Sequence, residues 1–226
     1  MCGRYSLTSP VEAIRALFGF DELPNLGVRY NIAPTQDVPV VRDDEDGKRR
    51  FAMMRWGLVP SWAKEIGGSA PLINARAETV GEKPSFRDAF RQRRCLIPSD
   101  GFYEWKSENG VKQPYRISLP DNALFAFAGI WEQWRSAQGE MLESCSIITT
   151  DANEQVAGIH HRMPVILPPE CYGDWLAAPL VACLRPYADA LRAYPISTAV
   201  NKVANDDASL WTETVPVKVA TQLDLL

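Results

Sequence analysis

The sequence has few of the residues that build disulfide frameworks and zinc sites. Its 226 residues include five cysteines, an odd number, and only two histidines, His160 and His161, which are adjacent. The cysteines are widely scattered and no C-x-x-C pair occurs, which disfavours both a disulfide scaffold and a zinc-binding module. We therefore expect no metal ion in this protein.

Long apolar runs and glycine-rich phosphate motifs are also missing. No stretch approaches the roughly 18 apolar residues that span a bilayer. Charged Arg4, Glu12 and Arg15 interrupt the N-terminal region, which is unlike a signal peptide. Without a glycine-rich phosphate-binding motif, no nucleotide cofactor is expected. The sequence thus predicts a cytoplasmic protein with no membrane partner and no cofactor.

The chain has no excess of positive charge. Its net charge of −4 disfavours a general nucleic-acid binder, because such proteins gain much of their affinity by neutralising phosphates. Any nucleic-acid site must therefore be a local patch. The arginine-rich run at 86–94, FRDAFRQRR, is one candidate source of that patch. The alternative interpretation of this run is a solvated helix end.

Turn and cap residues predict a single α+β domain over residues 1–226. Ser9 as the cap, Pro10 as the first helical residue and Gly19 as the stop predict a helix at 10–18. Alternating apolar residues around turn residues predict a hairpin at 37–57, with its turn at 43–47, and another at 101–119, with its turn at 108–110.

Later segments complete a largely antiparallel, strongly curved sheet flanked by helices. Strands are expected at 123–134 and 143–150. Asp151, followed three residues later by Glu154, resembles a capping box that opens a short helix. The tract 168–193 has helical spacing interrupted by two prolines. No repeat or linker divides the chain.

Cysteine at position 2 is the most informative single residue. Aminopeptidases remove Met1 when a small residue follows, which leaves an α-amine and a thiol on adjacent carbons of Cys2. Their reference pKa values, about 7.7–8.0 and about 8.5, leave both groups partly nucleophilic near neutral pH. Such an aminothiol forms a Schiff base with an aldehyde, and the thiol closes it to a thiazolidine ring. The alternative is an incidental small residue.

Two polar residues in the segment APLINARAET could bind a nucleic acid. On a strand, Asn74 and Arg76 would face the same side. Asn74 could hydrogen-bond a sugar or base, and Arg76 could clamp a phosphate. The alternative is a strand-end asparagine and a surface arginine paired with Glu78.

Acid–base candidates occur in PSDGFYEWK and GIHHRMPVIL. Glu104 lies among aromatic residues, and an apolar setting raises a carboxyl pKa toward the range useful for proton transfer. The alternative is an exposed glutamate paired with Lys106. His160 or His161 could pass protons near neutral pH, although a structural histidine is the alternative. Trp56, Trp62 and Trp105 could stack on exposed bases or pack in the core.

Several motifs together resemble the SRAP family, the SOS response-associated peptidases. They occur in the order MCGRY, RYNIAPTQ, RWGLVPSW, PLINARAET, GFYEW, IITTDAN and IHHRMP. The similarity continues through NKVANDDASL and so covers nearly the whole chain. It implies a domain built around a distorted β-barrel with a cleft for single-stranded DNA. It also implies an enzyme of the DNA-damage response that traps ring-opened abasic sites as a thiazolidine crosslink.

The resemblance assigns roles to individual residues. Cys2 would supply both nucleophiles, Asn74 would position the opened sugar, and Glu104 would assist ring opening and Schiff-base formation. His160, which follows an isoleucine as in the family pattern, would shuttle protons. A Schiff base also acidifies the neighbouring carbon, so abasic-site lyase activity is expected where ring closure is slow. A monomer, associated with the nucleoid through DNA, suits this role. The implied DNA contacts are Arg4, Pro34, Trp62, Arg76, Trp105 and Thr149.

Two other functions stay open. An N-terminal cysteine nucleophile also serves peptidases and amidohydrolases, and MCG begins many glutamine amidotransferases. Peptidase action could then be limited to removal of the protein's own Met1. A non-catalytic module for single-stranded DNA would use Arg76 and the aromatic residues but would leave Cys2, Glu104 and His160 without a role. Equal affinity for intact and abasic strands, without a covalent product, would identify such a module.

Overall fold

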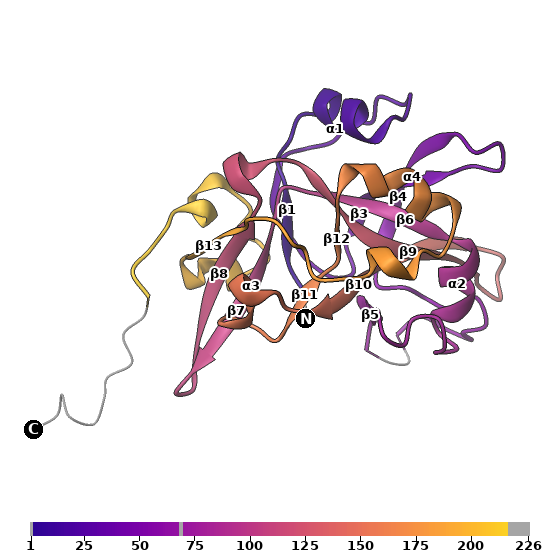
Figure 1. Ribbon diagram of the computed structural model, residues 1–226. Coiled ribbons are helices and arrows are strands. Elements are labelled where there is room, and N and C mark those ends of the chain that lie inside the picture. The colour runs from indigo at the N-terminus through magenta and orange to yellow at the C-terminus, as the bar shows by residue number, and fades with distance from the viewer. Residues whose placement is uncertain (1, 68–69, 217–226) are drawn as a thin grey trace, which may run out of the picture.

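Two β-sheets and short helices make up the computed structural model, which describes residues 2–67 and 70–216 (Figure 1). The helices are α1 Val11–Phe18, α2 Arg87–Gln92, α3 Glu154–Ala157 and α4 Tyr172–Ala177. The strands are β1 Tyr5–Leu7, β2 Arg29–Ile32, β3 Asp37–Asp43, β4 Arg49–Trp56, β5 Asn74–Arg76, β6 Arg94–Ser99, β7 Gly101–Glu108, β8 Val111–Ser118, β9 Phe125–Arg135, β10 Met141–Asp151, β11 Arg162–Pro164, β12 Ile166–Leu167 and β13 Arg192–Pro195.

The larger sheet closes into a barrel. Its path runs β10-β4-β3-β6-β9, and β9 pairs again with β10 from Gly129↔Ile147 to Arg135↔Met141. Closure leaves these strands without free edges. Only the pairs of β10 with β4 and with β5 are parallel among the strand pairs of the described residues. The prediction of a mostly antiparallel, barrel-like α+β fold is therefore confirmed, although a second sheet of order β13-β8-β7-β1-β2 accompanies the barrel.

Aromatic side chains fill the space between the two sheets. Tyr5 of β1 meets Trp56 and Phe127 edge-on, with ring centroids 5.3 and 5.7 Å apart. Phe127 also contacts Phe102 of β7. Edge-to-face pairs of this kind add specific attraction to the burial of apolar area. Trp56 is fully buried, so its role is core packing, and the alternative of base stacking does not apply to it.

Local turn signals placed the hairpins correctly. β3 and β4 flank the turn at 44–48, and β7 and β8 flank Asn109 and Gly110, whose φ angles of 48° and 82° suit a tight hairpin turn. Helix α1 ends at Gly19 with φ 72°, as predicted. Its start is different, because Pro10 is the cap position and no side chain caps the helix.

Two predictions about helices are wrong. Asn153, not Asp151, caps α3, and its side chain accepts a hydrogen bond from the Val156 amide. In the tract 168–193, regular α-helix is confined to α4. Ala178 is extended because a residue that precedes a proline avoids the helical region. The chain then forms a 3₁₀ turn at Val181–Cys183 and ends the tract in β13.

The arginine-rich run at 86–94 forms α2 and the start of β6. Two of its four arginines, Arg93 and Arg94, make contacts within the protein. Arg94 is buried and donates to the backbone carbonyl oxygens of Trp175 and Leu176, which ties β6 to α4. Arg93 pairs with Glu132 at 2.8 Å. The run is thus not a continuous basic patch. No helix within the described residues is long and apolar enough to cross a membrane.

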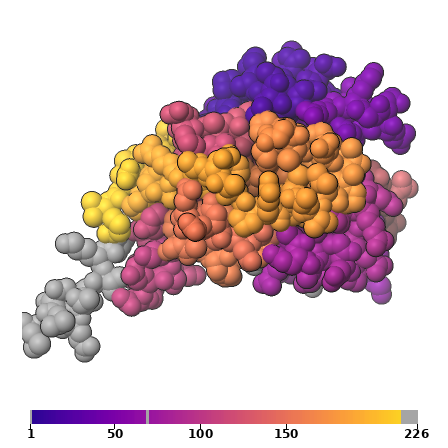
Figure 2. Space-filling view, viewed as in Figure 1, coloured from indigo at the N-terminus to yellow at the C-terminus, as the bar shows by residue number. Residues whose placement is uncertain are grey.

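After the buried strands β11 and β12, the segment that leads to β13 runs across the outside of the molecule. In Figure 2 its orange atoms cover the face toward the viewer, between the C-terminal part and α2. Asn153 Nδ2 donates to the Tyr187 carbonyl oxygen at 2.9 Å, and the Leu191 amide donates to Gln155 Oε1 at 2.6 Å. These bonds hold the segment against α3, which leads directly to the two histidines.

Candidate active site

Cys2 lies at the entrance to β1, next to β7. β1 runs antiparallel to β7 with Tyr5 opposite Phe102, and the Tyr103 amide donates to the Arg4 carbonyl oxygen at 2.9 Å. Continuing this register places Cys2 beside the part of β7 that carries Glu104 and Trp105. Cys2 itself is fully buried.

Asn74 fixes the backbone of Cys2. It begins β5, which pairs in parallel with β10. Its side-chain Nδ2 donates to the Cys2 carbonyl oxygen at 2.8 Å. The Asn74 Oδ1 atom is buried and has no hydrogen-bond partner among the described residues. A buried acceptor in this state costs free energy unless a ligand supplies a donor, so Asn74 can hold Cys2 and still bind a hydroxyl group.

Glu104 and His160 line one open cleft of about 500 Å³. Glu104 comes from β7 and is 2% exposed, whereas His160 follows α3 and is half-buried. Trp105 forms part of the wall, and its Nε1 donates to Asn201 Oδ1 at 2.8 Å, which fixes the indole ring. The cleft is lined by Glu104, Trp105, Ser107, Lys112, His160 and Asn201.

The backbone of Arg162 orients the His160 ring. His160 Nδ1 lies 3.0 Å from the Arg162 amide nitrogen and 3.1 Å from its carbonyl oxygen. His161 is exposed and stacks on His160 with ring centroids 4.4 Å apart. Burial lowers the pKa of His160, so the neutral imidazole predominates near neutral pH and can accept a proton.

Burial also sets the protonation of Cys2 and Glu104. It raises the pKa of the Cys2 thiol, and the nearby charge of Glu104 raises it further. Burial raises the pKa of Glu104 as well. Near neutral pH the thiol therefore keeps its proton, and reaction at sulfur requires a base close by. Glu104 holds its proton to a higher pH than an exposed glutamate, as a general acid must.

This raised pKa makes a prediction about stability. Glu104 contributes stability below its ordinary pKa, and that contribution is lost as the pH rises through its folded-state pKa. A Glu104→Gln variant stays neutral, so its melting temperature should rise relative to wild type as the pH increases above about 4.3, the ordinary pKa of a glutamate. Each kcal/mol gained in the free energy of unfolding corresponds to a rise of about 2–4 °C in the melting temperature. Melting curves at several pH values test this, and a variant that loses stability relative to wild type as the pH rises would contradict it.

The alternative reading of Glu104 as an exposed partner of Lys106 is wrong. Glu104 is buried, and Lys106 pairs with Glu108 at 3.2 Å. The pairing of Arg76 with Glu78 is also absent from the ion pairs of the described residues. Glu78 instead accepts from Arg162 at 2.8 Å. Arg76 is exposed on β5, on the same side as Asn74, where it can reach a ligand.

A buried arginine that sequence reasoning missed holds these elements together. Arg162 Nη1 pairs with Asp151 at 2.7 Å as well as with Glu78, and Nη2 donates to the Thr149 carbonyl oxygen at 2.7 Å. It thereby joins β11, β10 and the segment after β5. The sequence carries no local signal for this network, because its members are distant along the chain.

The remaining predicted DNA contacts lie in different settings. Arg4 is half-buried, and its Nη1 donates to Asn31 Oδ1 at 2.8 Å and to the Val200 carbonyl oxygen at 2.7 Å. Thr149 is buried beside Arg76 in the β5–β10 pair. Trp62 is 64% exposed and Pro34 is half-buried, and neither lines the cleft of Glu104 and His160.

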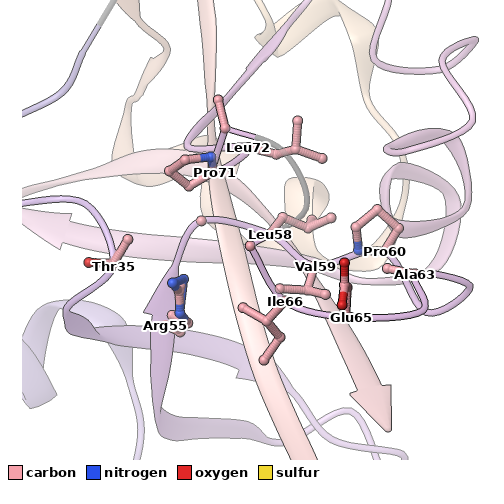
Figure 3. Close-up of a pocket in the computed structure, with 13 residues that line it drawn as sticks. Thr35, Arg55, Leu58, Val59, Pro60, Ala63, Glu65, Ile66, Pro71 and Leu72 are labelled. Atoms are coloured by element: carbon pink, nitrogen blue, oxygen red, sulfur yellow. The ribbon is translucent and has the colours of Figure 1, made fainter. Parts of the chain in front are cut away.

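A second cavity, of about 220 Å³, is lined mainly by apolar side chains. Figure 3 shows Leu58, Ile66 and Pro71 around it, with Arg55 and Glu65 at its sides. It contains none of the predicted catalytic residues, two of which, Glu104 and His160, line the open cleft instead. Within the described ranges, no group of three or more His, Cys, Asp or Glu residues could hold a metal ion.

The chain is similar in sequence and in structure to known proteins. Abasic site processing protein YoaM of Bacillus subtilis is 43% identical over 93% of this chain and 97% of its own length. Abasic site processing protein HMCES of Gallus gallus is 37% identical over 78% of this chain and 63% of its own length. A crystal structure of a protein from Bacteroides thetaiotaomicron matches with a TM-score of 0.84 and 29% identity, covering 95% of this chain and 100% of that one.

The family described as SOS response associated peptidase (SRAP) matches residues 1–203. That match covers every strand of both sheets and all the residues that line the cleft. The chain therefore belongs to the SRAP family.

Proposed function

We propose that this protein processes abasic sites in single-stranded DNA by trapping the sugar aldehyde as a thiazolidine on Cys2. The observation that carries the proposal is the hydrogen bond of 2.8 Å from Asn74 to the Cys2 carbonyl oxygen, beside the cleft of Glu104 and His160. The names of the relatives, abasic site processing proteins, support the class of substrate.

The first step is cleavage of the Met1–Cys2 bond, which frees the α-amine of Cys2. Residue 1 lies outside the described residues. Without this cleavage the amine and the thiol belong to different residues, and no five-membered ring can form from Cys2 alone. Self-processing would account for the peptidase named in the family description.

Four residues then share the chemistry. Glu104, as a general acid, protonates the ring oxygen of the abasic sugar and opens it to the aldehyde. The Cys2 amine attacks the aldehyde carbon, and loss of one water gives the Schiff base. The thiol adds across the C=N bond, with sulfur bonding to carbon and its proton passing to nitrogen by way of His160 or Glu104. Asn74 Oδ1 accepts a hydrogen bond from the hydroxyl of the opened sugar.

Capture as a thiazolidine removes the Schiff base that would otherwise permit strand cleavage. While the Schiff base persists, the proton on the neighbouring carbon is acidified, and β-elimination cuts the strand. We expect weak lyase activity that increases when ring closure is slowed. We expect a monomer that acts in the cytoplasm. A short stretch of exposed single-stranded DNA needs only the small number of cationic contacts proposed for this protein.

Arg76 is the proposed phosphate contact on β5. Arg76→Ala should weaken binding to single-stranded DNA about tenfold and reduce the slope of log K against log salt by about 0.7, the value for one phosphate contact. Fluorescence anisotropy at several salt concentrations measures both quantities. Arg87→Ala on α2 removes an equally charged, half-exposed side chain and is the matched control. An unchanged slope for Arg76→Ala, or an equal loss for Arg87→Ala, would remove Arg76 from the DNA site.

One comparison separates the proposed function from its alternatives. Protein without Met1 is incubated with matched single strands, one intact and one with a single abasic site, and run on a denaturing gel without borohydride. We expect a heat-stable adduct with the abasic strand alone. Equal binding of both strands without an adduct would identify a binding module. Hydrolysis of glutamine or of added peptides, again without an adduct, would identify an N-terminal-nucleophile hydrolase.

A further inference from the structure

Two thiols outside the proposed active site line a common cavity. Cys171 ends the 3₁₀ turn Pro169–Cys171, and Cys183 ends the turn Val181–Cys183. Both line an open cavity of about 450 Å³ in the segment between β12 and β13. By contrast, Cys95 and Cys145 are fully buried in the barrel.

The chain path around α4 brings these two thiols together. α4 starts directly after Cys171 and ends at Ala177. The chain then folds back through tight turns, in which the Leu180 amide donates to the Ala178 carbonyl oxygen and the Cys183 amide to that of Leu180. Both side chains line the same cavity, and Cys171 lies near enough to Cys183 to contribute to the rise of its pKa. A disulfide requires the two sulfur atoms to approach to roughly 2.0 Å, and two thiols that share one open cavity have room for the rotation and small backbone adjustment that this needs.

We propose that Cys171 and Cys183 form a redox modification site that a small-molecule disulfide, such as oxidised glutathione, converts to an intramolecular disulfide. Cys171 attacks one sulfur of the oxidant, releases one thiol and forms a mixed disulfide. Cys183 then attacks the Cys171 sulfur and releases the second thiol. The two cysteines together lose two electrons and two protons. These electrons and protons are taken up by the two thiols that the oxidant releases.

The exposure of the two thiols and the charge around them indicate that Cys171 reacts first and Cys183 second. Cys171 is the more exposed of the two thiols. Burial raises the pKa of Cys183 to about 11, which suits it to the second, intramolecular attack, where proximity compensates for low acidity. Arg185 also lines the cavity and lies near Cys183, where its guanidinium can attract the carboxylates of a glutathione-like oxidant.

The test uses the full-length chain with Cys2→Ala, so that the aminothiol does not react. After treatment with excess oxidised glutathione, intact mass should show the loss of two hydrogen atoms, and peptide mapping should join the peptides of Cys171 and Cys183. Adding Cys183→Ser should stop the reaction at one glutathione on Cys171. Adding Cys171→Ser should slow the reaction at least about tenfold, because the exposed thiol is absent.

A second measurement is independent of the variants. Closing this loop should raise the melting temperature of the oxidised parent by about 5–10 °C, and a reductant should reverse the change. A parent that keeps its mass, a disulfide that involves Cys95 or Cys145, or a glutathione adduct on the parent that does not resolve would overturn the proposal.

Discussion

The variant Cys2→Ser is expected to form no heat-stable adduct with an abasic strand. Serine is small enough to permit removal of Met1 and retains the α-amine, so Schiff-base formation is still possible. Its hydroxyl is a much weaker nucleophile than a thiol and does not give a stable ring. Borohydride should therefore trap this variant on DNA, and strand cleavage should increase over wild type, because the Schiff base persists.

Cys2→Ala should behave in the same way, and Cys171→Ser is the matched control. Cys171 is a free thiol with partial exposure outside the cleft, and its replacement should leave the yield of adduct unchanged. Denaturing gels with and without borohydride measure each result. A stable adduct in Cys2→Ser without borohydride would show that the covalent bond is made elsewhere in the protein.

Replacement of Glu104 by glutamine is expected to slow adduct formation by about 10²–10⁴-fold, the usual contribution of a general acid–base group. Glutamine keeps the size and the hydrogen-bonding reach of the side chain but can neither donate nor take up a proton at working pH. Glu104 is 2% exposed, lies near Cys2 and lines the same cleft as His160, so water cannot readily replace it. Single-turnover rates, with DNA affinity measured separately, give the effect.

Glu108→Gln is the control for this substitution. Glu108 lies on the same hairpin but is exposed and pairs with Lys106, and its replacement should leave the rate within about twofold of wild type. The expected gain of thermal stability in Glu104→Gln separates slow chemistry from poor folding. An unchanged rate in Glu104→Gln would remove Glu104 from the reaction, and a matching loss of DNA affinity would make it a binding residue instead.

The parts of the fold that sequence could predict are those with local signals. Asn109 and Gly110 supply the positive φ angles of the β7–β8 turn, and Gly19 supplies that of the α1 C-terminus. The helix prediction for the tract 168–193 was wrong. The spacing of its apolar residues suggested a helix, but Pro179 keeps the preceding Ala178 out of the helical conformation. Closure of the barrel joins β4 to β10, whose paired residues Arg55 and Ser144 are distant in sequence, and no local pattern encodes such a pair.

The same division holds for the candidate site. Cys2, Asn74, Glu104 and His160 were identifiable from their residue types and from their family motifs. The residues that support them were not identifiable. Asn201 fixes Trp105, and Arg162 joins β11, β10 and the segment after β5, through contacts that only the folded chain creates. Sequence could suggest which groups react, while their burial and the resulting pKa shifts required the structure.

Intact mass of the adduct, measured before and after borohydride, tests the central claim most directly. Protein without Met1 is incubated with a single-stranded oligonucleotide that contains one abasic site, and the product is weighed. A thiazolidine on Cys2 predicts the sum of the two masses minus one water, unchanged by borohydride, since the closed ring has no C=N bond to reduce. An adduct that gains two hydrogen atoms would be an open Schiff base, and the absence of any adduct with a verified free Cys2 would contradict the proposed function altogether.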